Sequence, residues 1–101
     1  QVFVRPGLGS PINTTGCDAR VIASFDELCK VFGYPQRSEV GNESIKAVWF
    51  GSINGLEYMI DNSIDNAKTM HSSHNWMLHG EHLAVPNLVY EALKATTGRR
   101  Q

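Results

Sequence analysis

The dipeptide Asn54-Gly55 lies between two runs of residues that are typical of β-strands, 45–53 and 56–61. Both residues readily adopt the positive φ angles of a two-residue type I′ turn, whose twist matches that of antiparallel strands. The pattern therefore predicts a hairpin in which Ile53 lies opposite Leu56. A register that is fixed at the turn also fixes which side chains share a face, because successive side chains of a strand alternate.

The two faces of this hairpin differ in composition. The face predicted to enter the core carries Ile45, Trp49, Ile53, Leu56, Tyr58 and Ile60. The opposite face carries Lys46, Val48, Phe50, Ser52, Glu57, Met59 and Asp61. Because Phe50 opposite Met59 makes the middle of this second face apolar, we expect a helix, another strand layer or a partner to cover it.

A helix is predicted before the hairpin, over about 25–33. Ser24 and Glu27 form the Ser-x-x-Glu pattern of a capping box, which marks the start of a helix. Gly33 followed by Pro35 marks its end, because glycine accepts the positive φ angle of a helix C-cap and proline cannot continue the helix.

A second helix is predicted after the hairpin, over about 85–97. Its apolar residues recur at the spacing of one helical face, with Pro86 in the first turn and Gly98 after the last turn. We therefore expect an α+β fold: a small antiparallel sheet with a central hairpin (about 45–61) and both helices, about 25–33 and 85–97, packed on one face.

The other segments are assigned from their breaks and their polarity. Residues 1–18 contain repeated glycines and prolines and are expected to form an N-terminal arm with at most one short strand. Residues 19–98 then form a single α+β domain, because 101 residues with 42% hydrophobic content can close one core. Residues 36–44 are polar without a period, which is typical of a surface loop, and residues 99–101 are expected to be a frayed tail.

The charge balance limits the classes of partner. Nine Lys and Arg against ten Asp and Glu give a formal charge of −1, which argues against duplex DNA as a partner. No apolar run approaches the roughly 20 residues that span a bilayer, so no membrane partner is expected. Cys17 and Cys29 are too few for a disulfide scaffold, which favours a cytoplasmic location. Cys29 falls in the apolar pattern of the first helix and is interpreted as a structural thiol.

All four histidines fall between His71 and His82 and flank Trp76. His71 and His74 share His-x-x-His spacing, as do His79 and His82, and four neutral imidazoles could fill a tetrahedral zinc shell. However, no cysteine lies nearby and nothing in the spacing selects a carboxylate ligand. We therefore expect the histidines to serve as surface and turn residues, predict no cofactor, and keep a zinc site as an alternative.

The same segment is interpreted as part of a binding surface. An aromatic ring surrounded by hydrogen-bond donors could hold a small nucleotide-like ligand or a partner protein. The candidate binding residues are Trp76, His79, Asn75, Lys68, His74 and Lys46. Trp76 and Leu78 also alternate as a third strand would, so core packing is the competing interpretation of Trp76. No catalytic residue is predicted, because no nucleophile elbow or phosphate-binding glycine loop is present.

Four short stretches resemble a family of small, mostly uncharacterised proteins encoded by bacteriophages and related viruses. That family has a helix ending in Phe-Gly-x-Pro, a strand with a tryptophan, a hairpin, and a Trp-x-x-Gly-Gly-like segment before a final helix. The stretches are Phe25-Asp26-Glu27-Leu28 running to Phe32-Gly33-Tyr34-Pro35, Lys46-Ala47-Val48-Trp49, Ile60-Asp61, and Trp76-Met77-Leu78-His79-Gly80. The resemblance covers roughly residues 20–95 and implies a shared fold. This chain departs from the family's pattern by placing His79 before a single Gly80 and by lengthening residues 65–75.

The sequence observations predict a small non-catalytic, homo-oligomeric binding protein, and the resemblance implies that it is phage-encoded and acts in the host cytoplasm against a host factor. It would inhibit a host defence protein or sequester a small signalling nucleotide. Two alternatives stay open: a metal-dependent hydrolase or nuclease that uses the His71–His82 cluster, and a structural virion or assembly component.

Overall fold

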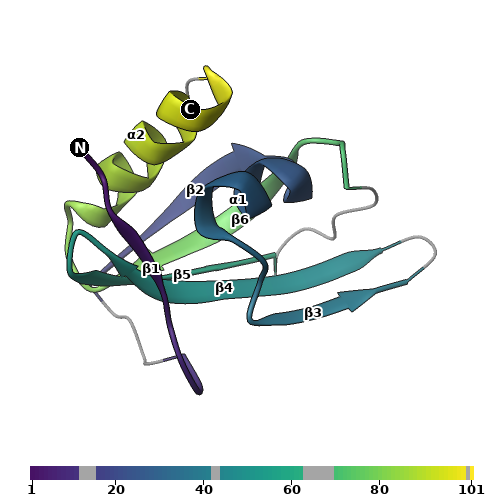
Figure 1. Ribbon diagram of the computed structural model, residues 1–101, viewed down its shortest axis with the longest axis horizontal. Coiled ribbons are helices and arrows are strands. Elements are labelled where there is room, and N and C mark those ends of the chain that lie inside the picture. Colours follow the sequence, from purple (N-terminus) through teal and green to yellow (C-terminus); the bar gives the residue numbers. More distant parts are fainter. Residues whose placement is uncertain (12–15, 42–43, 63–69, 100) are drawn as a thin grey trace.

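The computed structural model describes residues 1–11, 16–41, 44–62, 70–99 and 101. Over these residues the fold is α+β, as the sequence predicts, with a six-stranded antiparallel sheet and two helices (Figure 1). In chain order the elements are β1 (Val4–Pro6), β2 (Cys17–Ala23), α1 (Phe25–Phe32), β3 (Arg37–Val40), β4 (Ile45–Ile53), β5 (Leu56–Asp61), β6 (His74–Gly80) and α2 (Val85–Thr97).

The strands of the sheet follow the order β1-β4-β5-β6-β2, and β3 also pairs with β4. β1 and β3 share one edge of β4: β1 pairs with its end and β3 with its beginning. The β4–β5 hairpin turns at Asn54 and Gly55, which have φ angles of 50° and 81°. Ile53 pairs with Leu56, so the expected register is observed.

Local signals set the ends of both helices. The capping box of Ser24 and Glu27 is present at the start of α1, and Gly33 follows its last turn with φ 82°. α2 has a proline in its first turn and ends at Gly98, which adopts the left-handed conformation. These expectations are confirmed, because each depends on residues that are close together in the chain.

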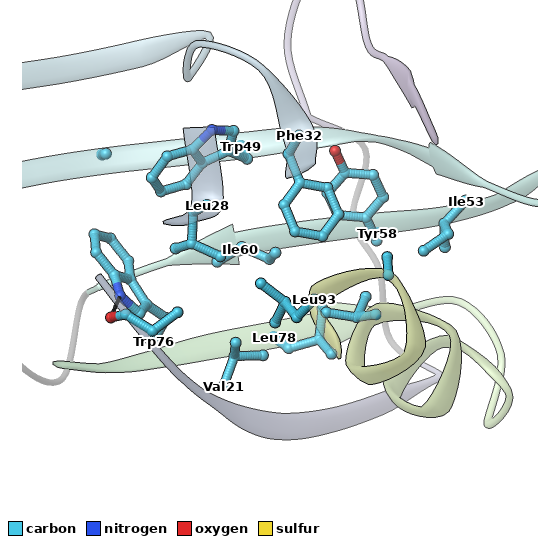
Figure 2. Packing of buried hydrophobic residues seen from close by; sticks show 14 of the residues in the cluster. Val21, Leu28, Phe32, Trp49, Ile53, Tyr58, Ile60, Trp76, Leu78 and Leu93 are labelled. Atoms are coloured by element: carbon cyan, nitrogen blue, oxygen red, sulfur yellow. Dashed lines mark hydrogen bonds between the residues drawn. The ribbon is translucent and has the colours of Figure 1, made fainter. Parts of the chain in front are cut away.

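The core lies between the sheet and the two helices, which are on the same side of it (Figures 1 and 2). Trp49 on β4 and Trp76 on β6 meet edge to face with ring centroids 5.2 Å apart. Leu28 of α1 and Leu93 of α2 are buried against the sheet residues. Burying each such aliphatic side chain contributes roughly 1.5–3 kcal/mol.

Three assignments made from the sequence need correction. Residues 37–40, expected to be a loop, form the edge strand β3. Because all four residues are exposed, their sequence does not alternate between polar and apolar residues, which is the pattern that would have indicated a strand. β2 begins at Cys17, inside the predicted arm of residues 1–18. The tail is not frayed at Arg99 or Gln101: Arg99 contacts Ser73 and Glu27, and Gln101 contacts β2.

Side-chain carboxamides complete the backbone hydrogen bonds of the sheet at its irregular points. Asn62 lies just beyond β5 and is buried. Its Oδ1 accepts from the Ala47 N–H at 3.2 Å, and its Nδ2 donates to the Ile45 carbonyl at 2.6 Å. Gln36 does the same for Phe50 in the gap between β1 and β3. These side chains form hydrogen bonds with backbone N–H and C=O groups of β4 that would destabilise the fold if they were left unpaired.

We predict that Asn62→Ala lowers the free energy of unfolding by about 2–4 kcal/mol, because it removes both partners of the β4 backbone from a buried position. Urea unfolding followed by tryptophan fluorescence measures the change. The matched control is Asn87→Ala on the exposed side of α2, where we expect a change within about 0.5 kcal/mol. Equal stability of the two variants would contradict this role of Asn62.

Candidate functional site

The candidate site is the face of the sheet that is turned away from α1 and α2, which we call the open face. Side chains alternate along each strand, so residues next to core residues point to this side. In the part of the chain that the structure describes, no helix lies over it. The open face carries Asp18, Arg20 and Ile22 on β2, Asn75, Met77 and His79 on β6, Glu57, Met59 and Asp61 on β5, and Lys46, Val48 and Phe50 on β4.

His79 bridges two carboxylates from the strands on either side of it. Its Nδ1 lies 2.8 Å from Oδ1 of Asp18 on β2, and its Nε2 lies 3.1 Å from Oδ2 of Asp61 on β5. The His79 side chain is 22% exposed and that of Asp61 is 15% exposed, whereas Asp18 is 67% exposed. Register explains this geometry: His79 pairs directly with Asp18, and Asp61 lies diagonally across the β5–β6 pair.

This arrangement has a chemical consequence. Each ring nitrogen of His79 lies at hydrogen-bond distance from a carboxylate oxygen, so both nitrogens are engaged within the sheet. With both ring nitrogens directed at carboxylates, neither is directed at a bound substrate. The trio therefore ties three strands together and places charge on the open face, and it lacks the geometry of a general base next to a nucleophile.

Apolar side chains occupy the middle of the open face. Met59 pairs with His79 across β5 and β6, and Met77 pairs with Asp61. Val48 lies opposite Asp61 on the other side, and all three apolar side chains are partly buried. The face thus combines an apolar centre with charged neighbours.

The covering of Phe50 that the sequence predicts is provided in part by the N-terminal segment. Gly7 follows β1 and donates its N–H to the Phe50 carbonyl at 2.8 Å. A Cβ added to Gly7 would lie 2.6 Å from Cδ2 of the Phe50 ring, so only glycine allows this approach. Phe50 is 5% exposed, which leaves Met59, Met77 and Val48 as the apolar side chains in the middle of the open face, with the more exposed Ile22 at its β2 edge.

The structure corrects the assignment of Trp76 to a binding surface. Trp76 is fully buried, and its Nε1 donates to the Ala23 carbonyl at 2.9 Å (Figure 2). It alternates with Leu78 along β6 toward the helices, as the competing interpretation requires. Its ring therefore packs in the core and does not face a ligand.

The structure separates the other candidate binding residues. Asn75 and His79 lie on the open face at opposite ends of β6, and Lys46 lies on the same face near the beginning of β4. His74 alternates with Asn75 and so faces the other side of the sheet. Lys68 lies outside the described residues.

The four histidines do not converge. His71 pairs with Asp26 at the start of α1, with Nδ1 2.5 Å from Oδ2, whereas His79 pairs with Asp18 and Asp61. His82 lies beyond β6, where its Nδ1 accepts from the Ala84 N–H. Over residues 1–11, 16–41, 44–62, 70–99 and 101, no three His, Cys, Asp or Glu side chains are placed to hold a metal ion together. Among the described residues, the convergent four-histidine arrangement that the spacing allowed is thus not formed.

The partners of His79 were missed from the sequence. Asp18 and Asp61 are 61 and 18 residues away from it in the chain, and neither forms a spacing motif with a histidine. The alternation of Asp18, Arg20 and Ile22 with buried Val21 and Ala23 marks β2 as a half-buried strand, and that signal was available. No sequence pattern indicates that β2 pairs with β6, and this pairing is what brings Asp18 to His79.

No protein-family model matches the chain, and no curated protein or solved structure is significantly similar to it. The resemblance to small phage proteins therefore stays a prediction. Among the described residues, no helix is long and apolar enough to cross a membrane.

We predict that Trp76→Ala lowers the free energy of unfolding by about 3–5 kcal/mol, because it removes a large, fully buried ring from the core. Chemical unfolding followed by circular dichroism measures the loss. Tyr34→Ala is the control, since Tyr34 is largely exposed and its removal should cost less than about 1 kcal/mol. A Trp76 variant as stable as the parent would contradict its place in the core.

Cys29 is expected to react slowly with alkylating reagents. Burial and the nearby carboxylate of Asp26 raise the pKa of the Cys29 thiol, so less thiolate is present at a given pH. In a Cys17→Ser variant, iodoacetamide at pH 8 should modify Cys29 more slowly than a cysteine in an unfolded peptide. Asp26→Asn should speed the reaction, because it removes the smaller of the two causes. The prediction would be contradicted if Cys29 in the folded protein were alkylated as fast as the cysteine of the unfolded peptide.

Proposed function

We propose that this chain is a non-catalytic binding protein whose open face binds a partner protein. The observation that carries the proposal is the composition of that face: the half-buried side chains of Met59, Met77 and Val48 lie at its centre without a covering helix among the described residues. Methionine adapts to irregular surfaces and is enriched at protein interfaces.

Charged side chains around this centre supply the specificity expected of a binding surface. Asp18 and Arg20 lie on the β2 side, and Lys46 and Arg37 lie on the β4 and β3 side. Such a polar rim around an apolar centre is typical of protein interfaces, in which the rim sets orientation and association rate.

A partner protein fits this surface better than a small nucleotide does. Recognition of a nucleobase usually depends on an exposed aromatic ring for stacking. Trp76 is in the core and Phe50 is covered, so the described residues of the open face expose no aromatic ring. The geometry of His79 supports binding over catalysis, because both of its ring nitrogens are directed at carboxylates.

The resemblance to small phage proteins supports a host protein as the partner and the host cytoplasm as the place of action. A protein of this kind would inhibit the host factor by occupying a surface that the factor needs. The surface would bind by shape and charge, without any change in covalent bonds.

The test is a comparison of two variants, one that introduces charge on the open face and one that introduces it elsewhere on the surface. Met59→Glu combined with Met77→Glu places two carboxylates in the apolar centre of the open face. Leu83→Glu is the control, because Leu83 is exposed between β6 and α2 and does not belong to the open face. Each protein is immobilised and exposed to host extract, and retained proteins and small molecules are identified by mass spectrometry. A retained protein is then purified and titrated by calorimetry.

We expect the parent and Leu83→Glu to bind the same host protein with equal affinity. The double methionine variant should bind it more than about 30-fold more weakly, because hot-spot residues contribute about 2 kcal/mol or more each. Binding that is the same in all three proteins would refute the role of the open face. Retention of only a nucleotide, or of nothing specific, would refute a partner protein.

A further inference from the structure

The outer edge of β2 is occupied by the side chains of Tyr90 on α2 and of Gln101. β2 is the last strand of the described sheet on this side. The hydroxyl of Tyr90 on α2 donates to the Arg20 carbonyl at 2.9 Å. The Ile22 N–H donates to Oε1 of Gln101 at 2.6 Å, and Nε2 of Gln101 donates to the Ile22 carbonyl at 2.9 Å. We call Tyr90 and Gln101 the edge cap.

The carboxamide of Gln101 stands in for a strand residue. In an antiparallel pair, two opposite residues exchange both N–H···O=C bonds. Gln101 offers Ile22 the same donor and acceptor through its side chain, so it occupies the atoms to which a neighbouring strand would bind. Uncovered edges of this kind are sites at which another strand can be added.

We propose that β2 pairs with β2 of a second copy of this chain, antiparallel across a two-fold axis, when the edge cap moves away. The axis passes through Ala19, so Asp18 lies opposite Arg20 of the partner, and Ile22 lies opposite Gly16. Arg20 and Ile22 direct their backbone groups away from β6, and Asp18 does so by alternation. The same atoms that the edge cap now binds would then bind the partner strand.

Charge complementarity selects the second copy and this register. Two pairs of Asp18 with Arg20 form symmetrically around the axis, and opposite charges across a strand pair are favourable. An axis through Arg20 would instead place two arginines opposite each other, and like charges in that position are unfavourable. Asp18 contacts His79 through Oδ1, which leaves Oδ2 for the partner's arginine.

The edge cap sets how strongly the two copies associate. Each copy must give up the hydrogen bonds of Tyr90 and Gln101 before β2 can pair, so these bonds compete with the dimer. Their removal should therefore tighten the dimer. The net value of a single hydrogen bond corresponds to roughly a two- to tenfold change in an equilibrium constant, and each copy gives up the three bonds of its edge cap, so we expect at least about a tenfold decrease in the dissociation constant.

Sedimentation velocity over a range of concentrations tests the role of the edge cap. The double variant Tyr90→Phe with Gln101→Ala should form dimers at concentrations at least about tenfold lower than the parent. Adding Ile22→Pro should abolish the gain, because proline removes the outward N–H and is tolerated on an edge strand. Circular dichroism verifies that each variant is folded. A double variant that associates no better than the parent, or a proline variant that associates equally well, would overturn the proposal.

Disulfide trapping tests the register independently. In a Cys17→Ser, Cys29→Ser background, Ala19→Cys places two thiols on the axis in a pair that is not hydrogen-bonded, where Cβ atoms approach within about 4.5–5.5 Å. Mild oxidation of the variant without the edge cap should give a covalent dimer. Ile22→Cys is the matched control, because it keeps Asp18 and Arg20 and lies away from the axis, so it should cross-link more slowly. Faster cross-linking at position 22, or none at position 19, would overturn this register. These variants leave Met59 and Met77 unchanged, so the outcome is separate from the test of the open face.

Discussion

The contact between Trp49 and Trp76 is the interaction on which the rest of the structure depends. The two rings meet across β5 and fill the space between the sheet and α1. Each indole N–H also reaches one end of the α1 segment: Trp76 donates to the carbonyl of Ala23, before the helix, and Trp49 donates to that of Gly33, after it. One aromatic pair thus supplies apolar burial and fixes where α1 lies on the sheet.

Because the core fixes which residues point toward the helices, it also decides which positions lie on the opposite face of the sheet. Because side chains alternate, residues next to Trp49 and Trp76 must point away from the helices. Asn75 and Met77 flank Trp76, so they lie on the open face for the same reason that Trp76 lies in the core. The composition of the open face is therefore not required by the core. An apolar centre retained there, outside the helix layer, is the main physical argument for a binding role.

Local signals in the sequence predicted the elements whose structure is decided locally. Asn54-Gly55 specified the turn and register of the hairpin, and Ser24 with Glu27 specified the start of α1. Pairing between distant segments was not accessible. β3 could not be found because an edge strand exposed on both faces has no apolar period. The site around His79 could not be found either, since its carboxylates come from strands whose neighbours are set by topology. The pattern along β6 did contain the burial of Trp76, as its alternation with Leu78.

Side-chain carboxamides have a common role in this sheet that no secondary-structure pattern reveals. Asn62 continues the β5 ladder where the strand ends, Gln36 bridges the gap between β1 and β3, and Gln101 covers the edge of β2. A carboxamide has the same donor and acceptor as a peptide group but is not part of a continuing backbone. It therefore satisfies the backbone groups of one strand residue without extending the sheet. The buried Asn62 is part of the fold, because its removal would leave two backbone groups of β4 without their partner. Gln101 is exposed and can be replaced by a real strand, and so the same chemistry that completes the fold inside the sheet leaves a site for association at the β2 edge.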